Sequence, residues 1–178
     1  ANGGSGAPSN QTVTSGASFT VSSTKPTKAN TNPTGYKVTF NPNGGTCATP
    51  DLTATRTTSY TFTSWNTAAN GTGTTYNAGA TYSANANLTL YAQYSSSTAT
   101  SALPLPAATR TGYTFKGWST SSSAASGSTG SYTPTGATTL YAVWSPNQYS
   151  VTYNGNGATS GNMSNSTATY NVGFRTKQ

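Results

Sequence analysis

Ser59-Tyr-Thr-Phe-Thr-Ser-Trp65 returns later in the chain as Gly112-Tyr-Thr-Phe-Lys-Gly-Trp118. In both copies the side chains alternate, with Tyr and Phe on one side and Thr, Lys or Trp on the other. A period of two among aromatic and β-branched residues is typical of a β-strand. The recurrence also predicts that the chain is built from repeated modules.

Two further elements recur around this motif. A second apolar strand appears as Leu88-Thr-Leu-Tyr-Ala-Gln-Tyr94 and as Leu140-Tyr-Ala-Val-Trp144. A strand with a turn appears as Val38-Thr-Phe-Asn-Pro-Asn-Gly-Gly45 and as Val151-Thr-Tyr-Asn-Gly-Asn-Gly157, and a truncated copy, Ala1-Asn-Gly-Gly4, opens the chain. The Asn-Gly and Gly-Gly pairs supply the positive-φ positions that tight turns need.

These elements predict an all-β or β-rich fold of tandem small modules. Thr, Ser, Asn and Gly dominate, and all four are poor in helix interiors. Only around residues 46–55 does a short helical turn stay open as an alternative.

The repeats divide the chain into four segments. We expect a partial repeat over 1–34, a complete repeat over 36–94, a repeat with an altered first strand over 95–144 and a partial repeat over 147–178. We call the strand with its Asn-Gly turn the opening half of a repeat, and the Tyr-Thr-Phe and Leu-Tyr-Ala strands its closing half. By this count the chain has three opening halves and two closing halves.

The composition restricts the function classes. Charged residues make up 5% of the chain, the net charge is +7, and the basic residues stand singly. A nucleic-acid interface would have a clustered basic stripe with interleaved aromatic residues, so we expect no nucleic-acid partner. No apolar run is long enough to span a membrane. No signal peptide is visible at Ala1, and we expect a mature or internal segment of a longer protein.

The inventory of reactive side chains disfavours catalysis and metal binding. The chain has no His, one acidic residue, Asp51, and one cysteine, Cys47. General acid–base catalysis needs a His, paired carboxylates or a tuned Lys, and metal sites need clusters of His, Cys or carboxylates. We therefore expect no enzyme, no catalytic or metal-ligating residue and no cofactor. A lone thiol forms no internal disulfide.

The repeated aromatic residues have two interpretations. They are core anchors of thin modules, or they form a platform on which sugars stack. Their fixed places in repeated strands favour the core, and we expect seven large side chains to be largely buried: Trp65, Trp118, Trp144, Phe62, Phe115, Leu90 and Leu140.

Taken together, these motifs resemble the Listeria–Bacteroides repeat family, the B-repeat type of internalin B and of other bacterial surface proteins. The resemblance covers 36–94 almost from end to end, 109–154 well and the two ends in part. Tyr94 stands where the family prefers the Trp seen at Trp144, and Ser59 and Ser64 replace the glycines seen at Gly112 and Gly117.

The resemblance implies β-grasp-like modules in tandem on secreted or wall-attached proteins, with stalk, spacer or adhesion roles and no catalysis. We expect a non-enzymatic structural region at the bacterial cell surface or outside the cell, acting as a stalk or filament subunit. The alternative is an adhesin module that binds surface glycans or host receptors. A further expected partner is a second copy of the chain, through strand addition by residues 1–24 or 149–174; the alternative is a fragment whose ends are frayed.

Overall fold

The computed structural model describes residues 2–83, 86–161 and 163–173. These residues form thirteen β-strands and no helix, so the predicted all-β fold is confirmed. The chain divides into two compact units, each assembled from two separate segments. Unit 1 contains Ala1–Thr34 and Thr55–Ala99, and unit 2 contains Gly35–Ala54 and Thr100–Gln178.

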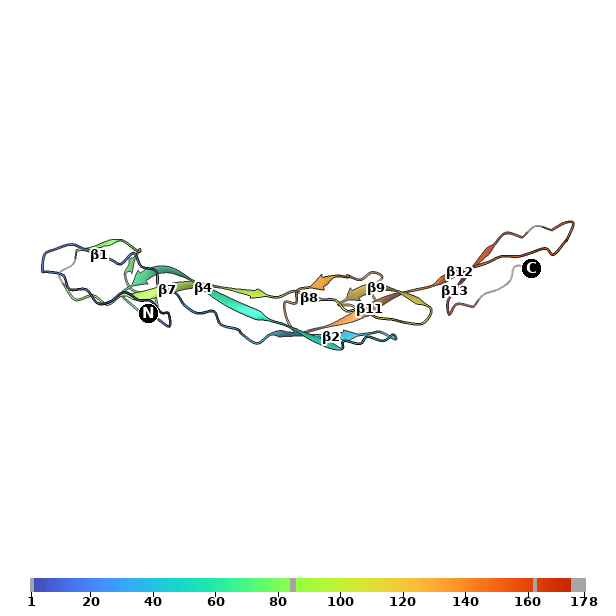
Figure 1. Cartoon of the computed structure of the whole chain (residues 1–178), viewed down its shortest axis with the longest axis horizontal. Helices are drawn as coiled ribbons and strands as arrows, with labels where there is room; N and C mark the ends of the chain where they lie inside the picture. The colour runs from blue at the N-terminus through green and yellow to red at the C-terminus, as the bar shows by residue number, and fades with distance from the viewer. Residues whose placement is uncertain (1, 84–85, 162, 174–178) are drawn as a thin grey trace. The chain divides into compact units, whose positions relative to one another are not determined.

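Unit 2 is built on a four-stranded sheet with the order β3-β2-β11-β9 (Figure 1). Its strands are β2 (Tyr36–Asn41), β3 (Asp51–Ala54), β9 (Tyr113–Ser119) and β11 (Thr138–Pro146). The outer pairs are antiparallel, whereas β2 and β11 in the middle are parallel. The short strands β8 (Leu103–Pro104) and β10 (Ser131–Tyr132) pair beside this sheet. A β-grasp-like arrangement remains a prediction.

The core of unit 2 follows from the alternation along β2. Val38 is fully buried and Phe40 is 3% exposed, whereas Lys37 points to solvent because neighbouring residues of a strand face opposite sides. The ring of Phe40 packs edge-on against Trp118 with the ring centroids 4.9 Å apart. Leu140 and Ala142 of β11 complete the centre of this core.

Unit 1 has fewer β-strands than unit 2. Its main sheet has the order β5-β4-β7, formed by β4 (Arg56–Asn66), β5 (Thr75–Tyr76) and β7 (Tyr91–Thr100). A second pair joins β1 (Phe19–Thr20) to β6 (Thr81–Tyr82). Its core contains Val21, Trp65 and Ala92, with aromatic side chains packed around them.

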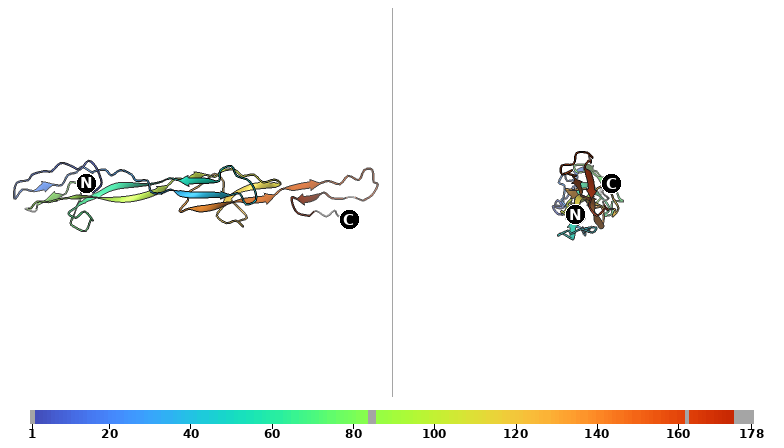
Figure 2. Two further views of the ribbon diagram at one scale, coloured as in Figure 1. Left: turned by 90° about the horizontal axis from the view of Figure 1, so that it is seen from below. Right: turned by 90° about the vertical axis from the view of Figure 1, so that its right-hand side faces the viewer.

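A last hairpin follows the sheet of unit 2 along the chain. It pairs β12 (Gln148–Val151) with β13 (Ser166–Thr169) in antiparallel register. Figure 2 shows this hairpin and the other strands of each unit from two further directions.

The seven side chains that were expected to be largely buried all belong to the two cores. Trp65, Trp118 and Leu140 are 4%, 2% and 2% exposed. The other four are partly buried and pack against these cores: Phe62, Leu90, Phe115 and Trp144. The small units have too few layers to enclose every large side chain, since the buried fraction of surface falls with size. Over 46–55 the structure has a β-bridge from Thr46 to Thr109, then β3, and no helix.

Candidate functional site: the Asn-Gly turns and a groove beside Arg110

The two buried indoles use their polar atoms inside the units. Trp118 Nε1 donates to the carbonyl of Pro106 at 2.7 Å, and Trp65 Nε1 donates to the carbonyl of Ser22 at 3.4 Å. A buried indole N–H that finds such an acceptor avoids the cost of an unmade hydrogen bond. These rings are therefore core anchors, and they offer no stacking surface for a sugar.

The Asn-Gly turn after β2 connects an opening half to a closing half through hydrogen bonds. Asn43 adopts φ 48°, and its backbone N–H donates a hydrogen bond to Asn41 Oδ1 at 2.9 Å. Its side-chain amide reaches across and donates to the carbonyls of Ser122 and Ala142, at 3.1 Å each. The amide thus cross-links the turn to the loop after β9 and to β11.

Unit 1 contains the same arrangement of a turn asparagine that binds a closing half. Asn2 adopts φ 47°, and its side-chain amide donates to the carbonyls of Ala69 at 3.0 Å and Ala92 at 3.3 Å. Ala92 occupies the position in Leu-Tyr-Ala that Ala142 occupies in the second copy. The glycine two residues after each asparagine lets the backbones approach closely. A Cβ at Gly45 would lie 2.5 Å from the Thr109 carbonyl oxygen.

Sequence reasoning missed this role of the two asparagines. The Asn-Gly pairs predict tight turns, and the positive φ angles confirm the turns. The long-range hydrogen bonds of the side chains leave no local signal, because their acceptors are backbone carbonyls of distant segments. The recurrence of Asn, where Gly alone would satisfy the turn, was the available hint.

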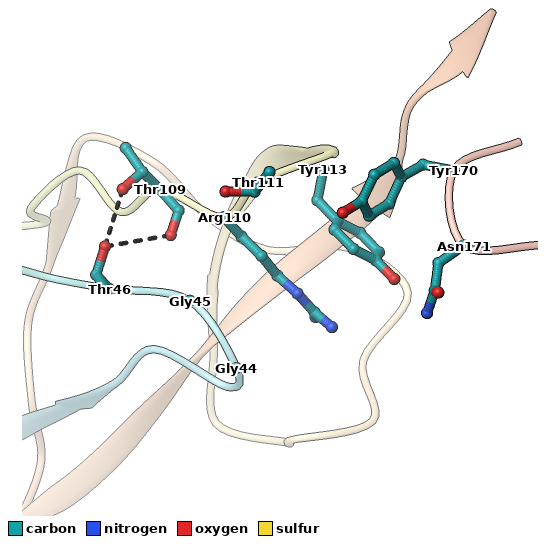
Figure 3. A pocket seen from close by; sticks show the side chains of 9 residues that line it. All are labelled: Gly44, Gly45, Thr46, Thr109, Arg110, Thr111, Tyr113, Tyr170 and Asn171. Atoms are coloured by element: carbon teal, nitrogen blue, oxygen red, sulfur yellow. Dashed lines mark hydrogen bonds between the residues drawn. The ribbon is translucent and has the colours of Figure 1, made fainter.

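An open groove of about 600 Å³ lies in unit 2 beside Arg110 (Figure 3). The guanidinium of Arg110 stacks on the ring of Tyr113, 3.9 Å from its centroid, and donates to the carbonyl of Asn43 at 3.4 Å. Tyr170 packs edge-on against Tyr113 with centroids 5.5 Å apart. The groove combines a cation, two aromatic rings and several hydroxyl groups: its lining residues are Gly44, Gly45, Thr46, Thr109, Arg110, Thr111, Tyr113, Tyr170 and Asn171.

The acidic residue and the cysteine of the chain, Asp51 and Cys47, are not among the residues that line this groove. Asp51 forms an ion pair with Lys37 at 2.9 Å and accepts a hydrogen bond from the Thr39 hydroxyl at 3.0 Å. These hydrogen bonds from Lys37 and Thr39 lower the pKa of Asp51 below its ordinary value. Cys47 is half-buried and its thiol donates to the carbonyl of Thr49 at 3.2 Å.

The described residues contain no group of three or more metal-binding side chains and no helix that could cross a membrane. In unit 1 the pKa of Tyr94 departs from its ordinary value. Its hydroxyl is buried without a hydrogen-bond partner. Desolvation raises the pKa of this tyrosine. A buried, protonated phenol beside Gly4 belongs to the packing of the opening half.

A family model for the Listeria-Bacteroides repeat domain matches the chain twice, over residues 36–93 and 94–143. The two matches together cover more than half of the chain. Neither the search of curated proteins nor the search of solved structures found a match. The matches follow the order of the sequence, whereas the division between the compact units runs through the first match: residues 36–54 belong to unit 2 and residues 55–93 to unit 1.

Proposed function

The chain belongs to the Listeria–Bacteroides repeat family, and from this premise we propose that it is a non-enzymatic structural region of a secreted or surface-anchored bacterial protein. In this role it acts as a stalk or as the subunit of an extracellular filament. A structural repeat must hold its segments together, and its recurring side chains should serve that purpose.

One observation carries the proposal: the polar groups of the repeated side chains form hydrogen bonds within their own unit. The amides of Asn2 and Asn43 and the indole of Trp65 donate to backbone carbonyls of distant segments, and the indole of Trp118 donates to the carbonyl of Pro106 in the same unit. The ion pair between Lys37 and Asp51 is exposed and joins β2 to β3. Solubility rests on Ser, Thr and Asn, which suits a surface that tolerates changes of pH and salt.

Immunogold labelling of intact cells of the source organism tests this role. We expect label outside the cell envelope on native protein, and loss of the label after brief protease treatment of whole cells. Label confined to the cytoplasm in thin sections would refute the proposal. Stretching of single molecules is a second test, because a load-bearing repeat should unfold cooperatively and recover its extension on refolding.

The groove beside Arg110 favours a second candidate, an adhesin module for acidic glycans. An arginine stacked on an aromatic ring presents its N–H groups in a fixed fork that suits carboxylates and sulfates. A glycan array probed with the chain tests this candidate. Binding to uronate-containing or sulfated glycans should fall with Arg110→Ala and persist with Lys116→Ala, which removes an exposed cation elsewhere in the unit. Equal loss with both variants would indicate non-specific attraction to the net positive charge.

A further inference from the structure

The two units are built on the same plan around their buried indoles, so they can be compared position by position. Each indole N–H donates to the carbonyl three residues after a strand residue that pairs with a tyrosine; these pairs are Phe19↔Tyr82 in unit 1 and Leu103↔Tyr132 in unit 2. Val21 and Leu105, two residues after those strand residues, therefore occupy equivalent positions. Their N–H groups agree, because each donates to the carbonyl two residues before the tyrosine.

The residue opposite the indole differs between the units. Tyr76 pairs with Trp65 in unit 1, whereas Ser128 takes this position beside Trp118 in unit 2. The ring of Tyr76 packs edge-on against Tyr82, with the ring centroids 5.9 Å apart. Among the residues that the structure describes, no second ring packs in this way against the counterpart of Tyr82 in unit 2.

The loop after the indole differs as well. In unit 1 the side chain of Asn66 is 1% exposed and fixes this loop, since its amide donates to the carbonyls of Gly71 and Gly73 and its oxygen accepts from two backbone N–H groups. Ser119 takes that position in unit 2. In the described part of the chain its hydroxyl forms one hydrogen bond, which it accepts from Ser121 N at 3.2 Å. The smaller side chain leaves space beside the loop.

The space left by these two differences is a cavity of about 270 Å³ in unit 2. Its floor is apolar, because Trp118 and Leu140 are both 2% exposed. Leu105 also lines it and is half-buried, although its equivalent Val21 is 1% exposed. No charged side chain lines the cavity, and five of its lining residues carry hydroxyl groups: Ser119, Thr120, Ser126, Ser128 and Tyr132.

We propose that this cavity binds a phenol ring, as carried by a tyrosine side chain or by a free phenolic compound. Unit 1 shows the bound arrangement with its own residue, because Tyr76 supplies the ring at the equivalent place. The ligand ring packs against Tyr132 as Tyr76 packs against Tyr82, in the edge-to-face geometry that aromatic pairs favour. It also covers Leu105, which restores the dispersion contacts that an unfilled space forfeits.

The lining residues also define the polarity of the ligand. Ligand cavities are mostly apolar, with a few polar groups that fix the orientation of the ligand. Here the hydroxyl groups of Thr120 and Ser126 are available to the phenol hydroxyl. A charged ligand would lose its hydration without gaining an opposite charge, so the ligand is neutral. The site goes beyond the proposed function, since a stalk needs no ligand, and it is separate from the groove beside Arg110.

Amide NMR titration of the whole chain with 4-methylphenol, which reproduces the tyrosine side chain, locates the site. We expect saturable shifts at Ser119, Gly127 and Ser128, with half-saturation in the millimolar range that suits so small a ligand. Gly71, in the filled loop of unit 1, should not shift. A second titration uses a blocked Gly-Tyr-Gly peptide. Shifts at the same amides would assign the site to tyrosine side chains of polypeptides, and shifts with 4-methylphenol alone would assign it to free phenolic compounds.

A cavity-filling variant and a matched control separate binding in the cavity from binding elsewhere. Ser128→Tyr restores the tyrosine opposite the indole, and we expect it to weaken binding of 4-methylphenol at least about tenfold. Thr129→Tyr adds the same side chain at the next residue, which is exposed and does not line the cavity, and it should bind as wild type does. Equal weakening by both variants would overturn the proposal.

The reciprocal variant tests the comparison between the units. Tyr76→Ser empties the equivalent place in unit 1, and 4-methylphenol should then also shift Gly71. Shifts that grow without saturation in the wild-type chain would mean that no cavity is occupied. Saturable shifts with methyl glucoside, and none with 4-methylphenol, would replace the phenol ring by a neutral sugar and overturn the proposal.

Discussion

Asp51 is the only acidic side chain, so the protein's response to acid depends on its surroundings. Lys37 and Thr39 lower the pKa of Asp51 in the folded state. Between the folded and unfolded pKa values the unfolded chain binds more protons, and stability therefore rises with pH in that window. The contribution is fully present above the unfolded pKa and is lost as the pH falls through the lowered folded pKa.

We predict that the melting temperature is flat from about pH 5 to pH 8 and declines only below about pH 4, near the ordinary carboxyl pKa. The decline should be small, since exposed ion pairs contribute little. Thermal melts of wild type and Asp51→Asn check this, and the variant should lose the decline. A midpoint that changes near neutral pH in the variant would mean that another group titrates.

Gly45 tests how closely the opening and closing halves approach. A Cβ at this position would lie 2.5 Å from the Thr109 carbonyl oxygen and 2.5 Å from Trp144 Cζ2, so the backbone or the indole must move. Overpacking of this kind costs about 1–3 kcal/mol. We expect Gly45→Ala to lower the free energy of unfolding in urea by that amount.

Gly136 offers the matched control, because a Cβ there meets nothing within 4 Å. Gly136→Ala should change the free energy of unfolding by no more than about 0.5 kcal/mol. Equal effects of the two substitutions would show that unfolded-chain entropy, and not the close approach, governs the result.

At the scale of the strands, a comparison of Leu140 with Leu90 measures how much a neighbouring strand adds to the stability that a buried leucine provides. They occupy the same position of the repeated Leu-Tyr-Ala strand, yet Leu140, which pairs with β2, is 2% exposed, while Leu90 is partly buried and lies outside the described strands. Truncating a fully enclosed leucine costs about 2–5 kcal/mol through lost transfer energy and the cavity. We predict a cost in that range for Leu140→Ala.

The cost of Leu90→Ala should be lower by at least about 1 kcal/mol, since roughly 0.8 kcal/mol is lost for each buried CH₂ and part of this side chain is in water already. Urea titrations of the two variants give the comparison. If both truncations cost the same, the greater exposure of Leu90 does not reduce the contribution of its side chain.

The strands and turns were readable from the sequence because their signals are local. Period-two alternation predicted the strand at Tyr60–Trp65, and the Asn-Gly pair predicted the turn at Asn43. The pairing of halves was not readable. Both closing strands carry Leu-Tyr-Ala, so nothing local tells β2 which one to join, and its choice of β11 is made by the whole chain.

Across the whole molecule, the order of halves along the chain differs from the order in which they pair. The opening half over 36–54 lies in unit 2, although the closing half that follows it directly, 55–94, lies in unit 1. The chain therefore crosses between the units after Thr34, after Ala54 and after Ala99. Neither unit is complete until segments separated by a full half of the other unit have come together, which favours slow folding with a high contact order.

The isolated segment 36–94 is where the sequence repeat and the compact units lead to opposite expectations. In the structure its first part, the β2–β3 hairpin, is stabilised by β11, and a lone two-stranded hairpin is marginal in water. Its second part loses the Ser22 carbonyl that accepts from Trp65 and the Asn2 turn that binds Ala92. We predict that the fragment 36–94 shows no cooperative melt and that its single indole, Trp65, emits as in water.

A chain that joins 35–54 through a flexible linker to 100–146 should instead melt cooperatively, because it holds all four strands of the unit 2 sheet and the Asn43 contacts. Fluorescence and calorimetry of the two chains decide between these divisions, and a cooperative melt of 36–94 with a protected Trp65 would show that the sequence repeat folds by itself.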